Sequence, residues 1–309
     1  MLAVTGATGF VGRALLGRLV RDGRPVRALT RSGPSGPGQV CIGDIGPDTD
    51  WRAALAGVRC VVHCAARVHV MADHHPDPLA AYRAVNTAGT ERLARQAAQA
   101  GVRRLVLVST VKVLGERSLP GQPLSANSPA QPEDPYGRSK HEAEQALWAV
   151  ARETGLEAVV VRPPLVYGPG VGANFRALMR WVAQGRPLPL GAIRNQRSLV
   201  GIHNLVDLLV RCTDHPQAPG RAWLVSDGHD LSTPDLVRAM AAATGRPARL
   251  WPVPVPALQL AGRLTGRAAA VARLTESLQV DISDTVRQLD WRPPYPVDIE
   301  LARTAEALA

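Results

Sequence analysis

A glycine-rich turn near the start of the chain constrains the fold more than any other feature. Three evenly spaced glycines follow the short apolar run 2–5 and precede the helix-forming run 13–21. Between a strand and a helix, such glycines let backbone N–H groups approach a pyrophosphate at the helix N-terminus. The turn therefore predicts a dinucleotide-binding unit. The residues expected to contact the cofactor in this turn are Gly6, Thr8, Gly9, Phe10, Val11 and Gly12.

Strand-like and helix-like runs alternate through the first half of the chain. Residues 57–66 and 104–110 are both strand-like, and a helix-like run separates them. This alternation predicts an α/β fold of the Rossmann type, built on a doubly wound parallel sheet. Ligands of such sheets bind beyond the carboxyl ends of the strands. Thr110 stands at one such end, and the small side chains of Ala65 and Ala66 leave room for a ligand at another.

The residues after the second and third predicted strands bear on the choice of cofactor. In NAD-binding proteins, an acidic residue about 20 positions past the glycines holds the ribose hydroxyls. Thr30 occupies that place here and Arg31 follows it, a pair that can accept a 2′-phosphate. The sequence therefore favours NADP over NAD; the alternative is that Arg31 is a solvent-facing residue at a strand end. Asp44 and Ile45 are expected to contact the adenine end of the cofactor.

A tyrosine and a lysine lie four residues apart at the start of a long helix-forming run. Side chains at this spacing share one face of a helix, so the Lys140 ammonium is expected near the Tyr136 phenol. A tyrosine titrates near about 10, and a neighbouring cation lowers that pKa. Lowering the pKa of Tyr136 to about 7 would require roughly 4 kcal/mol of stabilisation of the phenolate relative to the phenol. The positive ring of an oxidised cofactor could supply part of it. Taken alone, the pair is more often part of a surface helix with a solvated lysine, so its interpretation depends on the motifs upstream.

The basic charge of the chain does not indicate nucleic acid binding. The chain carries 36 lysines and arginines against 26 acidic residues, for a net charge of +10. The basic residues are scattered singly, and only 4% of the residues are aromatic. Nucleic-acid-binding surfaces usually combine basic clusters with aromatic side chains, so we expect no nucleic acid partner. Small polyphosphate ligands, which arginine binds well, explain the excess of basic residues better than nucleic acid does.

Other patterns limit the location of the protein and its cofactors. No apolar stretch approaches the ~20 residues of a membrane span, so we expect no membrane insertion. The first residues show no signal peptide. The four cysteines have no paired spacing and lie in or beside apolar segments. We therefore expect reduced thiols, a cytoplasmic location and no metal site.

Several motifs resemble those of the extended short-chain dehydrogenase/reductase family, and within it the nucleotide-sugar epimerase/dehydratase group. Together the motifs span nearly the whole chain. They are TGATGFVG at the N-terminus, HCAA after the fourth strand, VSTVKVLGE after the fifth, YGRSK, RPPLVYGPG, RSLVGIHNLVDLL and LQVDISDTVRQLDWRPP. The resemblance implies an NAD(P) cofactor and a nucleotide-sugar substrate.

The resemblance also implies roles for the residues that match the family's motifs. Thr110 matches the residue that hydrogen-bonds the reacting sugar oxygen, and Tyr136 matches the acid/base. Lys140 matches the residue that binds the nicotinamide ribose and lowers the pKa of the tyrosine. Transferring a hydroxyl proton while a hydride moves requires such a poised phenol and an orienting hydroxyl. Pro163 matches the cofactor-facing loop after the sixth strand.

The chain departs from the family in the segment that follows Thr110. Val113, Leu114 and Gly115 stand where many members have Val-Tyr-Gly, which removes a tyrosine near the substrate. No acidic pair directly follows Thr110. Water elimination requires an additional acid and base, so this departure argues against a dehydratase. Lys112 could touch the substrate or only solvent.

Glycine and proline become frequent after residue 162, where we expect a smaller α+β substrate domain to begin. The predicted Rossmann-type domain comprises residues 1–162 plus 198–216, and the second segment is expected to return to the sheet edge as a strand and a helix. The predicted substrate domain comprises residues 163–197 plus 217–309. Arginines in it could clamp a diphosphate. The residues expected to bind the substrate are Arg67, Lys112, Asn174, Arg197 and Arg273.

The sequence therefore predicts an NAD(P)-dependent oxidoreductase that acts at C4 of a UDP-sugar. Because the cofactor pattern favours NADPH, the first expectation is reduction of a UDP-4-keto-6-deoxy sugar. A UDP-sugar 4-epimerase with transient oxidation at C4 is the alternative, and a non-catalytic dinucleotide-binding module is a third. The chain particularly resembles the subgroup associated with bacterial surface-polysaccharide synthesis. The family also implies a homodimer formed through helices at 78–100 and 136–154.

Overall fold

The computed structural model describes residues 1–33, 35–36, 38–68, 76–119 and 121–308. In this part of the chain, the largest element is a seven-stranded sheet in the order β3-β2-β1-β4-β5-β6-β9, and every neighbouring pair of strands is parallel. The predicted doubly wound α/β fold is confirmed. The strands are β1 (Leu2–Thr5), β2 (Val26–Thr30), β3 (Gln39–Cys41), β4 (Cys60–His63), β5 (Arg104–Val108), β6 (Glu157–Arg162) and β9 (Arg221–Leu224).

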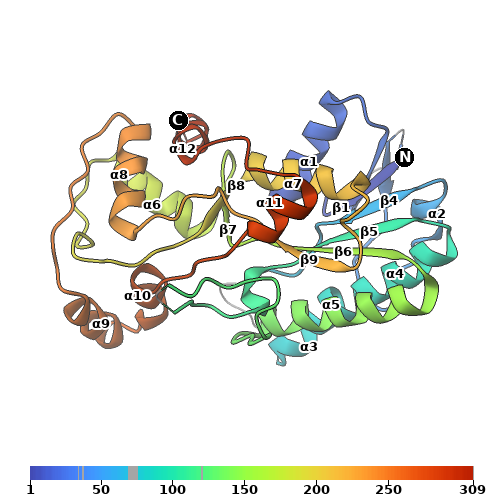
Figure 1. Ribbon diagram of the computed structural model, residues 1–309, viewed down its shortest axis with the longest axis horizontal. Coiled ribbons are helices and arrows are strands. Elements are labelled where there is room, and N and C mark those ends of the chain that lie inside the picture. The colour runs from blue at the N-terminus through green and yellow to red at the C-terminus, as the bar shows by residue number, and fades with distance from the viewer. Residues whose placement is uncertain (34, 37, 69–75, 120, 309) are drawn as a thin grey trace.

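Helices cover both faces of the sheet, because its central strands are apolar on both sides. Figure 1 shows α1 (Phe10–Arg21) and α7 (Ile202–Asp214) above the sheet, and α4 (Gly89–Gln99) and α5 (Pro135–Thr154) below it. The short helix α2 (Arg52–Leu55) packs beside α4.

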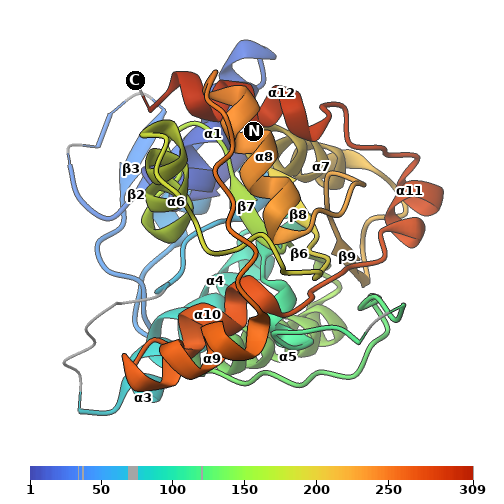
Figure 2. The same cartoon turned by 90° about the vertical axis from the view of Figure 1, so that its left-hand side faces the viewer.

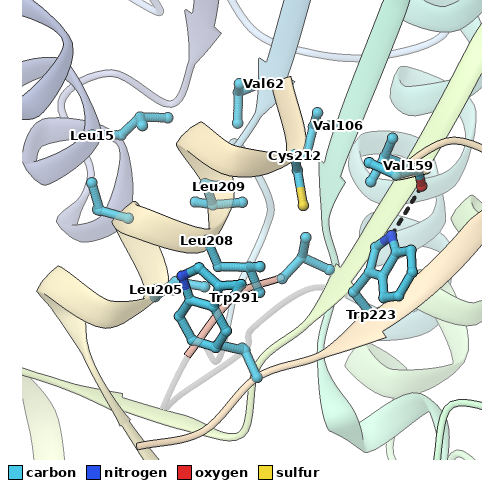
Figure 3. Packing of buried hydrophobic residues seen from close by; sticks show 14 of the residues in the cluster. Leu15, Val62, Val106, Val159, Leu205, Leu208, Leu209, Cys212, Trp223 and Trp291 are labelled. Atoms are coloured by element: carbon cyan, nitrogen blue, oxygen red, sulfur yellow. Dashed lines mark hydrogen bonds between the residues drawn. The ribbon is translucent and has the colours of Figure 1, made fainter. Parts of the chain in front are cut away.

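Each covered face of the sheet has its own hydrophobic cluster. The cluster between the sheet, α1 and α7 is drawn in Figure 3, where leucines of both helices point toward the valines of the strands. Trp223 closes one end of this cluster, and its indole Nε1 donates a hydrogen bond to the carbonyl of Ala218 at 2.9 Å. On the opposite face, Leu93 of α4 and Leu147 of α5 pack under the same strands.

The helix expected over residues 78–100 is divided into three parts. It begins as α3 (Pro78–Tyr82), continues as a π-helical turn (Arg83–Ala88) and ends as α4. A π-helical turn adds a residue to the helix, and such turns are frequent at functional sites. This turn carries the buried Asn86, whose contacts are described below.

The C-terminal half builds a second, smaller group of elements. A two-stranded parallel sheet of β7 (Leu165–Tyr167) and β8 (Leu199–Gly201) stands beside three helices, α6 (Ala173–Ala183), α8 (Thr233–Ala243) and α12 (Val297–Glu306). Their buried side chains, which include Met179, Met240 and Leu301, form a separate hydrophobic cluster. The remaining helices are α9 (Val255–Leu264), α10 (Ala268–Thr275) and α11 (Ser283–Leu289).

The edge of the main sheet differs from the prediction. Residues 198–216 do contain a strand and a helix, but β8 pairs with β7 rather than with the main sheet. The edge strand is β9, from the segment 217–309 that the sequence placed in the smaller domain. The reason is packing, because Trp223 of β9 is buried in the cluster beneath α1 and α7, and Leu224 is buried in a separate small cluster with Leu278 and Val280.

Candidate active site

The glycine turn has the tight geometry that a dinucleotide site requires. Gly6 has a φ of +63°, and a Cβ placed on it would lie 2.7 Å from the backbone nitrogen of Ala65. A Cβ on Gly12 would lie 2.1 Å from the carbonyl oxygen of Gly6. Side chains at either position would fill this space, so the turn needs glycine.

The N-terminus of α1 adds an electrostatic feature that favours a phosphate. Gly9 is its N-cap residue and supplies no side-chain cap, and the first turn holds no acidic residue. Uncapped N–H groups at a helix N-terminus attract anions. The turn from Gly6 to Gly12 therefore fits the pyrophosphate of a dinucleotide. Within the described ranges, no cluster of three His, Cys, Asp or Glu side chains could hold a metal ion.

Two hydrogen bonds fix the loop after β4 against the glycine turn. The Oγ1 atom of Thr5 lies 2.7 Å from Nδ1 of His63, and it accepts a bond from the backbone N–H of Ala65 at 3.2 Å. Burial lowers the pKa of His63 to about 3, with a smaller contribution from the charge of Lys140. His63 is therefore neutral near pH 7 and is a core residue. The loop carries Ala65 and Ala66 next to the glycines, where the sequence expected them.

The first turn of α5 presents the tyrosine and the lysine on one face. Asp134 caps the helix, because its Oδ1 accepts a bond from the backbone N–H of Gly137 at 2.6 Å. Pro135 occupies the first helical position, which favours helix initiation. Tyr136 is half-buried, and its ring lies edge-on to that of Tyr82 at a centroid distance of 6.2 Å. Lys140, one turn later, is almost completely buried.

Burial decides the protonation of both groups in this structure. It raises the pKa of Tyr136 above its ordinary value, and the carboxylate of Asp134 and the ring of Tyr82 add to the effect. Burial also lowers the pKa of Lys140 to about 8, which the carboxylate of Glu144 partly offsets. The lowered tyrosine pKa expected from Lys140 is therefore not what these protein groups produce by themselves. Desolvation of the phenolate is the largest cause of the raised pKa, and Lys140 is not among the groups that shift it.

A buried acidic residue that the sequence reasoning missed lies beneath Lys140. Glu144 is one further turn along the same face of α5, and it forms a bidentate ion pair with Arg162 at the end of β6. The hydroxyl of Ser109 also donates a hydrogen bond to this carboxylate. The spacing of four residues after Lys140 was the signal that could have revealed Glu144. Tyr136, Lys140 and Glu144 thus form one stripe along α5.

A second missed residue, Asn86, connects the cofactor-side loop to the tyrosine. Its side chain accepts a bond from the backbone N–H of Arg67 at 2.8 Å and donates one to the Arg67 carbonyl at 3.0 Å. It also donates to the hydroxyl of Ser139 at 2.9 Å, and Ser139 donates to the carbonyl of Tyr136 at 2.8 Å. Asn86 therefore fixes the loop after β4 relative to the first turn of α5.

Thr110 stands just past the carboxyl end of β5, as predicted. Its Oγ1 accepts a bond from the backbone N–H of Lys112 at 3.3 Å and so caps the short helix Val111–Val113. The backbone N–H of Val111 bonds to the carbonyl of Pro163 at 2.9 Å, which brings the expected cofactor-facing loop next to Thr110.

The environment of Lys112 differs from both predicted alternatives. Its ammonium lies 2.6 Å from Asp134 and 2.8 Å from Glu116, so two carboxylates hold it. Burial opposes the charge, but these two partners raise the pKa of Lys112. Lys112 thus joins the segment after Thr110 to the cap of α5, rather than pointing only into solvent.

Two of the expected substrate arginines share one neighbourhood. Arg197 donates a hydrogen bond to the carbonyl of Glu276 at 3.0 Å. Burial lowers the pKa of Arg197, the charges of Glu276 and Glu116 oppose this, and the charge of Arg273 adds to it. Arg197 and Arg273 therefore lie close enough to repel each other, although Glu276 and Glu116 act on Arg197 more strongly than Arg273 does.

The other predicted ligand contacts are more peripheral. Arg67 lies over the ring of Tyr82, with its guanidinium carbon 5.4 Å from the ring centroid. Asn174 is exposed at the start of α6. Arg31 and Asp44, at the ends of β2 and β3, are exposed side chains whose Nε and Oδ1 atoms lie 3.9 Å apart. Ile45 follows Asp44 and packs against the sheet cluster beneath it.

Comparisons with known proteins place the chain in a family. Residues 2–226 match the family described as the NAD dependent epimerase/dehydratase family. The chain is 47% identical to a UDP-glucose 4-epimerase of Vibrio cholerae over 99% of this chain and 94% of that protein. It is 26% identical to the N-acetyl-alpha-D-glucosaminyl-diphospho-ditrans,octacis-undecaprenol 4-epimerase of Escherichia coli O157:H7, over 97% and 93% of the two chains. The structure of MoeE5 in complex with UDP-glucose and NAD superposes with a TM-score of 0.78, at 24% identity and with 99% and 97% coverage.

Proposed function

Because this chain belongs to the NAD dependent epimerase/dehydratase family, we propose that it interconverts the C4 epimers of a nucleotide sugar. It is an enzyme of the short-chain dehydrogenase/reductase class. The observation that carries the proposal is the 47% identity, over nearly the full length, to a UDP-glucose 4-epimerase. UDP-glucose and UDP-galactose, which differ only at C4, are therefore the proposed substrates. The sequence had favoured a 4-keto-sugar reductase, and the relative's activity favours the epimerase instead.

We propose NAD as the cofactor. An epimerase returns its hydride to the sugar and consumes no reducing power, so it has no need of NADPH. Arg31, which the sequence assigned to a 2′-phosphate, faces the carboxylate of Asp44 at 3.9 Å. That carboxylate weakens the attraction of Arg31 for a phosphate. When bound, NAD would accept hydride from C4 of the sugar and return it to either face of the ring.

The chain's own residues would hold the reactants and move the proton. The turn from Gly6 to Gly12 would bind the pyrophosphate of the cofactor. Tyr136 would take the proton from the C4 hydroxyl as the carbonyl forms, and would give it back when the hydroxyl is restored. Thr110 would orient the same oxygen, and Lys140 would hold the phenolate by its positive charge.

The substrate's diphosphate would be bound by arginines of the smaller domain. Arg197 and Arg273 lie within range of each other's charge, and arginine binds diphosphates with paired hydrogen bonds. We propose the same two domains as the sequence did, with β9 (Arg221–Leu224) added to the Rossmann-type domain. A homodimer formed through α4 and α5 is part of the same proposal and is measurable by light scattering.

A second candidate substrate follows from the Escherichia coli relative, whose name specifies a sugar on a diphospho-undecaprenol lipid. The exposed leucines of α9 favour this candidate, because an apolar surface would suit a polyprenyl chain. Both candidates require the same chemistry at C4. Assays with a UDP-sugar and with a polyprenyl-diphosphate sugar would distinguish them.

The test is a direct assay of epimerisation with two tyrosine variants. UDP-galactose is incubated with the purified protein, and the sugar nucleotides are separated and quantified. Tyr136→Phe is expected to lose turnover by about 10²–10⁴-fold, the usual contribution of a general acid/base, while retaining dinucleotide binding. Tyr82→Phe, whose ring packs against Tyr136, is the matched control and should retain most of the activity.

The identity of the bound dinucleotide provides an independent readout. NAD released from the denatured protein would support the epimerase. Consumption of NADPH in the presence of a UDP-4-keto sugar, without conversion of UDP-galactose, would instead establish the reductase and refute the proposal.

A further inference from the structure

The helical hairpin of α9 and α10 exposes large apolar side chains. Leu264 is 80% exposed and Leu260 is 58% exposed, both on α9. Trp251, in the extended segment that leads into α9, is 61% exposed. In both Figures 1 and 2, α9 and α10 lie side by side, and Figure 1 shows them at one end of the molecule, away from the seven-stranded sheet. Exposed leucines and tryptophan concentrated in one segment are typical of an interaction surface.

The same segment is basic and has no acidic residue. Residues 236–275 contain six arginines and no aspartate, glutamate or lysine. All six are exposed, and only Arg238, at the start of the segment, forms an ion pair with a described residue. The five that remain are Arg246, Arg249, Arg263, Arg267 and Arg273. The segment that carries the exposed apolar side chains therefore supplies positive charge and no acid of its own.

The geometry of α9 directs its leucines away from the rest of the protein. Gly262 is buried against α10, where an added Cβ would lie 2.7 Å from a methyl group of Val271. Leu260 and Leu264 are each two residues from Gly262, which places them roughly 160° around the helix from it. Arg263 lies beside Leu264 on the helix surface and Arg267 follows in the turn after α9, so arginines flank the leucines. We call Leu260, Arg263, Leu264 and Arg267 the hairpin face.

We propose that the hairpin face docks on the surface of an anionic lipid bilayer. Leucine and tryptophan side chains enter the interfacial layer of a bilayer, and flanking arginines bind anionic headgroups. A second copy of the chain fits the face poorly, because a symmetric contact would bring the arginines of two acid-free surfaces together. The docking is peripheral, since no described helix is long and apolar enough to cross a bilayer. It goes beyond the proposed reaction and does not depend on it.

Docking would also fix how the proposed diphosphate-binding arginines lie relative to the membrane. Arg273 lies at the end of α10, and its charge lowers the pKa of the nearby Arg197. A hairpin seated on lipid would therefore hold the two proposed diphosphate-binding arginines near the headgroup layer.

The test measures binding of the full-length protein to vesicles by co-sedimentation at low salt. Vesicles of phosphatidylglycerol and phosphatidylethanolamine are compared with vesicles of phosphatidylcholine alone. We expect at least a tenfold stronger partition onto the anionic vesicles, and a loss of this preference at high salt. The double variant Leu260→Ser/Leu264→Ser should lower the partition at least tenfold. Arg263→Gln/Arg267→Gln should lower it by about fivefold for each arginine removed.

Variants at exposed positions of the Rossmann-type domain test whether the loss of any exposed apolar or basic side chain has the same effect on vesicle binding. Val20→Ser removes an exposed apolar residue of α1, and Arg59→Gln/Arg152→Gln removes two exposed charges. Both should leave the partition within about twofold of the wild type. Circular dichroism and thermal melting would show that the variants fold.

Three outcomes would overturn the proposal. The wild type could partition equally onto the two kinds of vesicle, or onto neither. The leucine variant could bind as well as its Val20→Ser control. Light scattering could show that the wild type is a dimer and the leucine variant a monomer, which would assign the hairpin face to a contact with a second copy of the chain.

Discussion

Glu144 and Arg162 form a buried ion pair directly beneath Lys140, on the face of α5 that also carries Tyr136. The Nη2 atom of Arg162 lies 2.6 Å from one carboxylate oxygen, and its Nε lies 3.1 Å from the other. The negative charge of Glu144 raises the pKa of Lys140, which burial lowers. Glu144 therefore favours the protonated form of the buried lysine, and a protonated lysine is what a phenolate at Tyr136 requires.

Replacing Glu144 should change both stability and the pH dependence of the reaction. Glu144→Gln leaves the buried Arg162 charge without its partner, which typically costs about 3–5 kcal/mol of unfolding free energy. It also lowers the pKa of Lys140 further, so the alkaline limb of the pH profile of kcat/KM should move to lower pH. Urea unfolding and pH-rate profiles measure the two effects.

Ser109→Ala is the control for this variant, because it removes a hydrogen bond to the same carboxylate but leaves the charge. It should cost about 1 kcal/mol of stability and leave the alkaline limb in place. An unmoved limb in Glu144→Gln would show that Glu144 serves only the packing of α5 on β6.

The pKa of Lys140 is directly measurable, because Lys112 and Lys140 are the only lysines in the sequence. Protein labelled with ¹³C at the lysine Cε should give two NMR signals. One should titrate at about pH 8, from the buried Lys140. The other should titrate above 10.5, because Asp134 and Glu116 raise the pKa of Lys112. Lys112→Arg assigns the signals, and two coincident titrations near 10.5 would contradict the burial of Lys140.

The same lowered pKa predicts that Lys140 destabilises the fold near neutral pH. A folded pKa of about 8 against the ordinary 10.5 means that the unfolded chain binds the proton more tightly. The cost of the buried ammonium is therefore fully present below about pH 8 and disappears as the pH rises toward 10.5. Lys140→Met should be more stable than the wild type at pH 7, by up to about 3 kcal/mol, and inactive. Urea unfolding at pH 7 and pH 10 checks this, and a constant difference between the two proteins would refute it.

The parts of the site that sequence reasoning found are those that depend on near neighbours. Gly6, Gly9 and Gly12 meet within one turn, and Tyr136 and Lys140 meet within one turn of α5. The strand–turn–helix order places both groups at the carboxyl edge of the sheet. Such features follow from local periodicity and from the parallel topology.

The parts that it missed depend on contacts between distant segments. Glu144 meets Arg162 from another element, and Asn86 reaches Ser139 across 53 positions of sequence. The raised pKa of Tyr136 results from burial, which no local spacing reveals. The edge position of Trp223 was missed for the same reason, since only the packed sheet shows which short apolar run completes it.

Two alanine substitutions in the first βα unit should have opposite effects. Gly12→Ala places a Cβ 2.1 Å from the carbonyl oxygen of Gly6, where only backbone movement could relieve the clash. We expect a loss of a few kcal/mol of stability and at least tenfold weaker NAD binding. Gly17→Ala, on the exposed side of α1 with no atom within 4 Å of the new Cβ, should gain about 0.5–1 kcal/mol. Urea unfolding and NAD titration of both variants give the comparison. Similar losses of stability and NAD affinity in the two variants would mean that Gly12 is not packed closely against the carbonyl of Gly6.

The exposed pair Arg31 and Asp44 should set the preference between NAD and NADP. Their side chains are 79% and 90% exposed, so solvent screens the pair and each variant should change affinity only severalfold. Asp44→Asn removes a charge that would repel a 2′-phosphate, and it should raise NADP affinity relative to NAD by about threefold to fivefold. Arg31→Gln should have the opposite effect on the same ratio. Asp48→Asn, which removes a nearby exposed acid, is the control and should leave the ratio unchanged. Titration calorimetry with both dinucleotides measures the ratio, and equal changes for NAD and NADP in Asp44→Asn would exclude this pair as the determinant.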